Sequence, residues 1–140
     1  FTVIAFAVIN NFFILIKFHP YQNIFFNSSI ERKANKLFEI DYWGLGNVES
    51  LEYLQELEVK EFSIAVASFT PLNYSNLIID KKNKIEFRDI KEQNSKYIFS
   101  NYIYEMNPNL LKKYKIPENY FKIFSLKRGK IIINEIYKIK

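Results

Sequence analysis

Residues 120–140 read YFKIFSLKRGKIIINEIYKIK, two apolar runs on either side of the dipeptide Arg128-Gly129. Isoleucine, phenylalanine and tyrosine favour extended backbone. Glycine in a short connection permits the positive φ angle that a tight hairpin turn needs. The tail therefore predicts a β-hairpin with its turn at Arg128-Gly129.

Three more strands are expected before this hairpin, because apolar or aromatic runs occupy residues 62–69 (FSIAVASF), 85–90 and 96–104. Helix signals separate them. Asn47 is suited to an N-cap and precedes apolar residues at helical spacing. Thr70-Pro71 predicts the start of a second helix that runs to about residue 79, and a short third helix is expected over 109–114.

This order predicts an α/β fold, with α+β as the alternative. We expect a small mixed sheet, two to three helices and the C-terminal hairpin. Residues 47–140 would form this domain and residues 19–46 a linker to the N-terminal segment. No internal repeat interrupts it.

The N-terminal segment, FTVIAFAVINNFFILIKF, has no charge before Lys17. Three interpretations are open: the end of a transmembrane helix, the core of a secretory signal, and a buried helix of a soluble protein. An 18-residue helix is about 27 Å long, just short of the roughly 30 Å bilayer core. The transmembrane interpretation of residues 1–18 is favoured, since a secretory signal would need a basic start. Because the chain starts at Phe1 and not at Met, we expect it to be part of a longer protein.

His19-Pro20 is expected to end this helix, because proline cannot continue it. Tyr21 and the pair Phe25-Phe26 follow. Aromatic residues gather at membrane–water interfaces, but they also pack under soluble domains. For His19 we favour a hydrogen bond at the membrane edge over a chemical role, since no acidic residue lies within ten positions.

The composition excludes several kinds of chemistry. The chain has no cysteine, one histidine and three glycines. Thiolate or multi-histidine metal sites, a cysteine nucleophile and a glycine-rich phosphate loop are therefore excluded. We expect no metal and no cofactor in this chain.

The loop Asp41-Tyr42-Trp43 joins a carboxylate to two aromatic rings just before a predicted helix. Such a set can bind a sugar or a lipid head group. The favoured interpretation is structural: Asp41 accepts backbone hydrogen bonds, and Trp43 is a buried apolar anchor. The loop would then connect the membrane edge to the domain.

The C-terminal end is basic, since residues 111–140 contain nine basic and two acidic residues. Lys127, Arg128 and Lys130 at the predicted turn are candidate contacts for anionic lipid or lipid-linked phosphate. Nucleic-acid binding is not favoured, because isoleucines follow the turn where an RNA-binding strand needs stacking aromatics.

Taken in order, several strings resemble the C-terminal part of bacterial GT-C-type polytopic membrane glycosyltransferases. The strings are HPYQ at 19–22 with FFN at 25–27, FEIDYWGLG at 38–46, FSIAVASF, YIFSNYIYEMNP and the closing IYKIK. The family is similar to the dolichyl-phosphate-mannose–protein mannosyltransferases and the lipid A aminoarabinose transferases. The resemblance covers nearly the whole chain.

The resemblance implies a parent enzyme in the plasma membrane that uses a polyprenyl-phosphate sugar, with this domain on the extracytoplasmic side. Catalytic acids of such enzymes lie near the N-terminus, so the chain would be an accessory part that contacts upstream transmembrane helices and membrane lipid. His19, Tyr21, Asp41, Tyr42 and Trp43 would have interface roles. The alternative is a single-span, membrane-anchored binding module whose basic hairpin contacts anionic lipid. A net positive charge after residue 17 weakly favours the cytoplasmic side instead.

Overall fold

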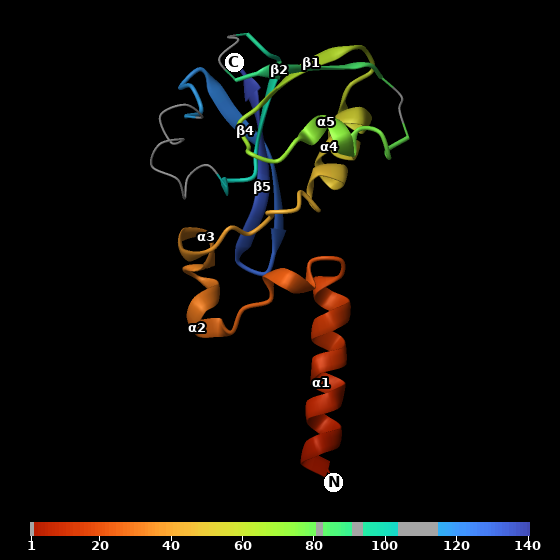
Figure 1. The fold of residues 1–140 in the computed structure, drawn as a ribbon, viewed down its shortest axis with the longest axis vertical. Coiled ribbons are helices and arrows are strands. Elements are labelled where there is room, and N and C mark those ends of the chain that lie inside the picture. Colours follow the sequence, from red (N-terminus) through yellow and green to blue (C-terminus); the bar gives the residue numbers. More distant parts are fainter. Residues whose placement is uncertain (1, 81–82, 91–93, 104–114) are drawn as a thin grey trace.

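The computed structural model describes residues 2–80, 83–90, 94–103 and 115–140. One long helix, α1 (Thr2–Phe18), projects from a domain built around a sheet (Figure 1). The N-terminus is at the free end of α1, and the C-terminus lies at the opposite end of the molecule. The junction between α1 and the domain is therefore the place where the two parts must be held together.

The remaining helices are short, apart from the one that covers the sheet. They are η1 (Gln22–Ile24), α2 (Ser28–Glu31), α3 (Ala34–Leu37), α4 (Asn47–Leu57) and α5 (Leu72–Ser75). Asn27 caps α2, because its Oδ1 accepts from the amides of Ser29 and Ile30 at 3.2 Å. Residues 19–46 thus wind around the base of the domain in single turns of helix.

The sheet has five strands in the order β2-β1-β3-β5-β4. The strands are β1 (Phe62–Val66), β2 (Ile85–Asp89), β3 (Tyr97–Ser100), β4 (Tyr120–Arg128) and β5 (Ile131–Ile139). β1 pairs in parallel with β2 and β3, whereas β5 pairs antiparallel with both β3 and β4. The sheet is mixed, with the hairpin on one side of the parallel strands.

Successive side chains of a strand point to opposite faces of the sheet. On β3, Tyr97 and Phe99 pack with Leu51 and Leu54 of α4, while Ile98 belongs to a separate cluster. The main core therefore lies between the sheet and α4. The cluster around Ile98 lies on the face opposite α4.

A second apolar cluster joins the N-terminal segment to the hairpin. Its buried members come from the end of α1, from residues 21–40 and from the hairpin: Phe18, Tyr21, Ile24, Ala34, Ile40, Leu126, Ile131 and Ile133. The linker expected over residues 19–46 is thus packed against the sheet domain through much of its length.

The predicted α/β class, the mixed sheet and the C-terminal hairpin are confirmed, but the two turn residues are Gly129-Lys130 and not Arg128-Gly129. The helix expected after Asn47 is also present, but Gly46 and not Asn47 is its N-cap. The Asn47 side chain instead donates to Ser75 Oγ at 3.2 Å. The helix expected over residues 109–114 lies outside the described residues.

Several elements are shorter than predicted, among them β3, which covers Tyr97–Ser100 of the expected 96–104. β1 ends at Val66, because Ser68 Oγ accepts from the amide of Thr70 at 3.0 Å and turns the chain. α5 ends at Ser75 and does not reach residue 79. Its polar residues hydrogen-bond readily outside a helix, which explains the early end.

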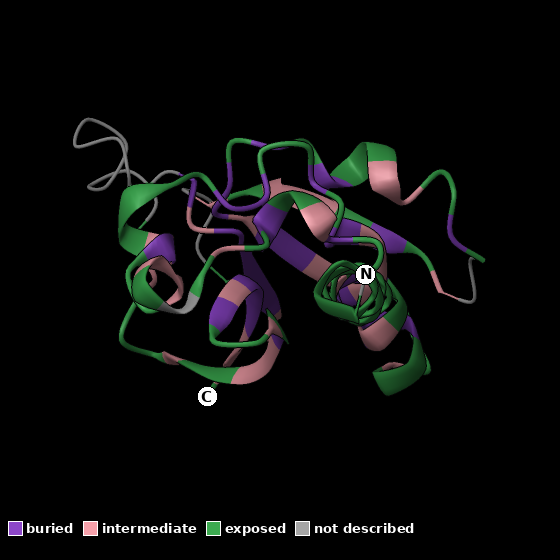
Figure 2. Ribbon diagram, turned by 90° about the horizontal axis from the view of Figure 1, so that it is seen from below, coloured by how far each residue is buried: buried purple, intermediate pink, exposed green. Residues whose placement is uncertain are grey.

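Helix α1 has large apolar side chains exposed on all sides. Only its last residue, Phe18, is buried. Seen end-on in Figure 2, the helix is exposed around its circumference. In the described part of the chain, no helix reaches the combined length and apolar character that crossing a membrane requires.

Candidate functional site

The candidate site is the junction where α1 meets the domain. α1 ends at Phe18, and the His19-Pro20 peptide bond after it is cis. The Gln22 side chain lies 3.0 Å from His19 Nδ1 and donates to the carbonyl of Leu15 at 3.4 Å. His19 is exposed, and the Gln22 carboxamide is its hydrogen-bond partner.

Tyr21 is buried at this junction beneath the hairpin. The guanidinium carbon of Arg128 lies 4.7 Å from the centre of the Tyr21 ring, and Arg128 Nη2 donates to Glu49 Oε1 at 2.9 Å. Burial raises the pKa of the Tyr21 hydroxyl, and the nearby Glu49 carboxylate adds to this rise. The three side chains connect the end of α1, helix α4 and the hairpin.

Lys127, Arg128 and Lys130 were predicted to be candidate anion contacts, and the structure gives one of them, Arg128, partners within the protein. Arg128 is in an ion pair and stacks on Tyr21, whereas Lys127 and Lys130 are exposed. An arginine between a ring and a carboxylate is already partly desolvated, which favours an internal role. For Lys127 and Lys130, an anion contact stays a prediction.

The hairpin turn itself is held by α2 and α3. Gly129 has φ +60°, and a Cβ atom there would collide with the carboxylate of Glu31. The same carboxylate accepts from the amide of Lys130 at 2.9 Å. Asn35 pairs with the backbone of Ile132, accepting from its amide at 3.0 Å and donating to its carbonyl at 2.5 Å. The side chains of Glu31 and Asn35 thus hydrogen-bond to the backbone at the turn from one side.

Asp41 is the buried centre of the neighbouring loop, with 2% of its surface exposed. Its carboxylate accepts from the amides of Leu45 at 2.7 Å and Gly46 at 3.1 Å. Its carbonyl accepts from Asn101 Nδ2 at 3.3 Å. Burial raises the pKa of Asp41, and the two backbone amides oppose this. Both carboxylate oxygens are engaged in folding the loop, as the structural interpretation requires.

Trp43 is not the buried anchor that we expected. It is 79% exposed, and its neighbour Tyr42 is 52% exposed. The two rings contact each other edge to face, with centroids 5.1 Å apart. Because Asp41 folds back onto the amides four and five residues later, residues 42 and 43 are at the outside of a tight turn. The loop is anchored by its carboxylate and not by its tryptophan.

Two buried polar residues that tie this loop to the sheet were not predicted. Asn134 on β5 donates to the carbonyl of Gly46 at 2.9 Å and accepts from Ser50 Oγ at 2.6 Å. A Cβ at Gly46 would lie 2.6 Å from Asn134 Nδ2, so the approach needs glycine. Asn101, after β3, hydrogen-bonds to the Asp41 carbonyl and to Thr70. Buried asparagines follow no hydrophobic period, so their pairing could not be read from the sequence.

Glu135 is a further buried carboxylate that was not singled out. It accepts from Lys122 Nζ at 2.9 Å, Ser125 Oγ at 3.0 Å and the Tyr137 hydroxyl at 2.6 Å, and also from Tyr102. Burial raises its pKa, and the Tyr137 hydrogen bond lowers it. An acidic residue inside the apolar run IIINEIY was the available signal. Its donors on β4 and beside β3 fasten the hairpin to the parallel strands.

Among the residues described, no group of three histidine, cysteine or acidic side chains could hold a metal ion. Comparison with protein-family models, curated proteins and solved structures finds no match to this chain. The junction can hold α1 and the domain in a fixed relative position. Tyr42, Trp43 and the two turn lysines, Lys127 and Lys130, are among its exposed residues.

Proposed function

We propose that this chain is the C-terminal, extracytoplasmic accessory domain of a GT-C-type membrane glycosyltransferase that uses a polyprenyl-phosphate-linked sugar. Helix α1 is then the carboxyl-terminal part of the last membrane helix. The domain is held at the membrane surface by the junction of Tyr21, Arg128 and Glu49. The described residues of the domain contribute no catalytic group.

One observation carries this proposal: the two strings most specific to the resemblance pack together. Tyr21 of HPYQ and Ile40, next to the DYWGL string, belong to one buried cluster with the hairpin. The negative charge of Asp41 also contributes to the raised pKa of Tyr21. Strings that lie 20 residues apart thus serve one junction, which is the role expected of an accessory domain fixed on a membrane helix.

The surface of α1 supports the membrane part of the proposal. Its exposed large apolar residues are Val3, Ile4, Phe6, Val8, Ile9, Phe12, Phe13, Leu15 and Ile16. Burial of apolar surface is worth roughly 25 cal/mol per Å², so leaving such a helix in water is costly. A contiguous apolar surface of this kind marks contact with lipid or with other helices. Both neighbours are available in a polytopic enzyme.

The coding sequence upstream of Phe1 tests the proposal directly. Several further apolar spans and an acidic loop near the N-terminus are expected there. A start codon within about 30 residues of Phe1 would contradict a polytopic parent, because one further membrane span alone takes about 20 residues.

A transfer assay with the full-length parent tests the accessory role. Asp41→Asn keeps the shape of the side chain and removes its charge. Sugar transfer, normalised to protein level, should stay within about tenfold, whereas loss of a catalytic carboxylate would cost on the order of a hundredfold or more. Loss of transfer in a folded, abundant Asp41→Asn protein would place the loop in the active site instead.

The exposed Lys127 and Lys130 favour a second candidate, a membrane-anchored module that binds anionic lipid. Its test is acetylation of these two amines in nanodiscs at low salt. Protection in anionic but not in neutral nanodiscs, lost at high salt, would support it. Equal modification in both lipids would reject it, with exposed Lys60 as the internal control.

A further inference from the structure

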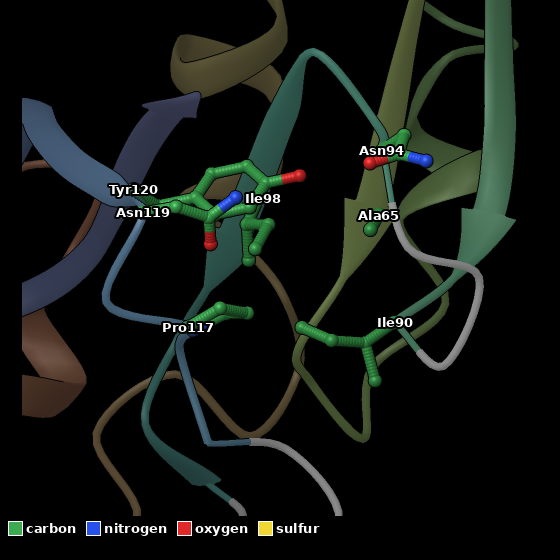
Figure 3. Close-up of a pocket in the computed structure, with 7 residues that line it drawn as sticks. All are labelled: Ala65, Ile90, Asn94, Ile98, Pro117, Asn119 and Tyr120. Atoms are coloured by element: carbon green, nitrogen blue, oxygen red, sulfur yellow. The ribbon is translucent and has the colours of Figure 1, made fainter. Parts of the chain in front are cut away.

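A cleft of about 350 Å³ lies on the face of the sheet opposite α4 (Figure 3). Its floor is formed by Ala65 of β1 and Ile98 of β3, which are paired neighbours in the sheet. The cleft is deep at Ala65, because the alanine side chain is a single methyl group and its neighbours are larger. Backbone groups below it are already paired between the two strands.

The sides of the cleft come from segments that adjoin these strands. Ile90, after β2, and Pro117, before β4, form apolar walls at one end (Figure 3). Tyr120 at the start of β4 lies across from them, and its hydroxyl donates to the carbonyl of Ser95 at 2.5 Å. This hydrogen bond fixes the ring, so the aromatic wall is preformed.

Two carboxamides, those of Asn94 and Asn119, stand on opposite sides of the cleft (Figure 3). Both residues are exposed, and neither carboxamide hydrogen-bonds to any residue that the structure describes. Asn94 has φ +86°, a left-handed conformation that asparagine adopts more readily than most residues. Each carboxamide offers both donors and an acceptor to a ligand.

We propose that this cleft binds a neutral sugar residue. None of the described residues that line it is charged, so none of these residues would form an ion pair with a phosphate or a carboxylate. A sugar ring has an apolar C–H face, which suits the floor and the tyrosine wall. Its hydroxyls donate and accept at the rim, which suits two carboxamides. The volume lies within the range of about 300–1,000 Å³ typical of small-ligand sites.

An extended peptide fits the geometry less well. Peptides that bind to sheets add to an exposed edge and pair with free backbone groups. This cleft lies over two strands that are already paired with each other. The sugar interpretation deepens the proposed glycosyltransferase role, but binding is measured on this chain without a lipid-linked donor. Sugar binding by this chain and sugar transfer by the parent are measured in separate assays. Failure of one proposal can therefore be distinguished from failure of the other.

The test is an NMR titration of the full 140-residue chain in micelles with methyl glycosides of glucose, mannose and N-acetylglucosamine. Saturable shifts are expected for the backbone amides of Ala65 and Ile98 and for the side-chain amides of Asn94 and Asn119. A single sugar residue should bind with a Kd of about 1–10 mM. Absence of saturable shifts with all three glycosides would overturn the proposal.

The variant pair Asn94→Gly with Asn119→Ala removes both carboxamides, and glycine tolerates the positive φ at position 94. Affinity should fall about tenfold, as expected for the loss of two hydrogen bonds. Asn73→Ala removes an exposed asparagine of α5 and should leave the titration unchanged. Unchanged binding in the double variant, equal shifts with glycerol, or saturation by a neutral acetylated tripeptide but by no glycoside would each reject the sugar site.

Discussion

The sheet domain and its junction with α1 are stabilised by different kinds of contact. The parallel strands and α4 share a core of apolar side chains, in which Leu51, Leu54, Ile64 and Phe99 are fully buried. At the junction, a smaller apolar cluster is supplemented by polar contacts that each satisfy a particular donor or acceptor, such as Glu31 with the hairpin turn. Apolar packing dominates the core of the domain, whereas the junction combines an apolar cluster with individual hydrogen bonds.

The largest effect is expected in the core of the sheet domain. Leu54→Ala would remove a fully buried side chain from the core and should lower the free energy of unfolding by about 3 kcal/mol. Denaturation of the chain in micelles, followed by circular dichroism, measures this. Leu57→Ala, on the exposed part of the same helix, should change stability by less than about 0.5 kcal/mol. Equal losses in the two variants would contradict the assigned core.

A smaller loss is expected in the Asp41 loop. Asp41→Ala leaves the amides of Leu45 and Gly46 without their acceptor in a buried loop, which should cost about 2 kcal/mol. The same denaturation assay applies, with exposed Asp80→Ala as the matched control. If the two aspartate variants unfold at the same denaturant concentration, the carboxylate does not organise the loop.

At the hairpin, Arg128→Ala removes a partly exposed ion pair and a cation–π contact. Exposed pairs contribute little and an arginine–ring contact somewhat more, so a loss of about 1 kcal/mol is expected. Lys127→Ala, its exposed neighbour, serves as the control. If Arg128→Ala lowers the free energy of unfolding no more than Lys127→Ala does, the contacts of Arg128 with Tyr21 and Glu49 do not stabilise the junction.

The smallest effect is expected for Trp43→Ala. Because the side chain is 79% exposed, stability should change by less than about 0.5 kcal/mol. Thermal unfolding of the isolated chain is the measurement. A loss near 3 kcal/mol, typical of truncating a buried tryptophan, would mean that the ring is buried after all.

The contrast between the sheet domain and the junction also explains what the sequence could predict. Apolar runs such as FSIAVASF and those on either side of Arg128-Gly129 are typical of buried strands, so the strands and the hairpin were predictable. The Asn35 side chain pairs with the backbone of Ile132, 97 positions away, and a single polar side chain carries no periodic signal. The tryptophan was misjudged because its apolar character suggests burial, while the fold of its loop depends on the hydrogen bonds of Asp41.

The central claim is that α1 lies in lipid while the hairpin turn lies at the membrane surface. The chain has no cysteine, so single spin labels can be placed at Val8→Cys on α1 and at Lys130→Cys on the turn. In bilayers, collision with dissolved oxygen reports lipid exposure and collision with a water-soluble nickel chelate reports water exposure. The label at position 8 should collide far more with oxygen than with nickel, and the label at position 130 should show a much higher ratio of nickel to oxygen collisions. Strong nickel access at position 8 would contradict the claim.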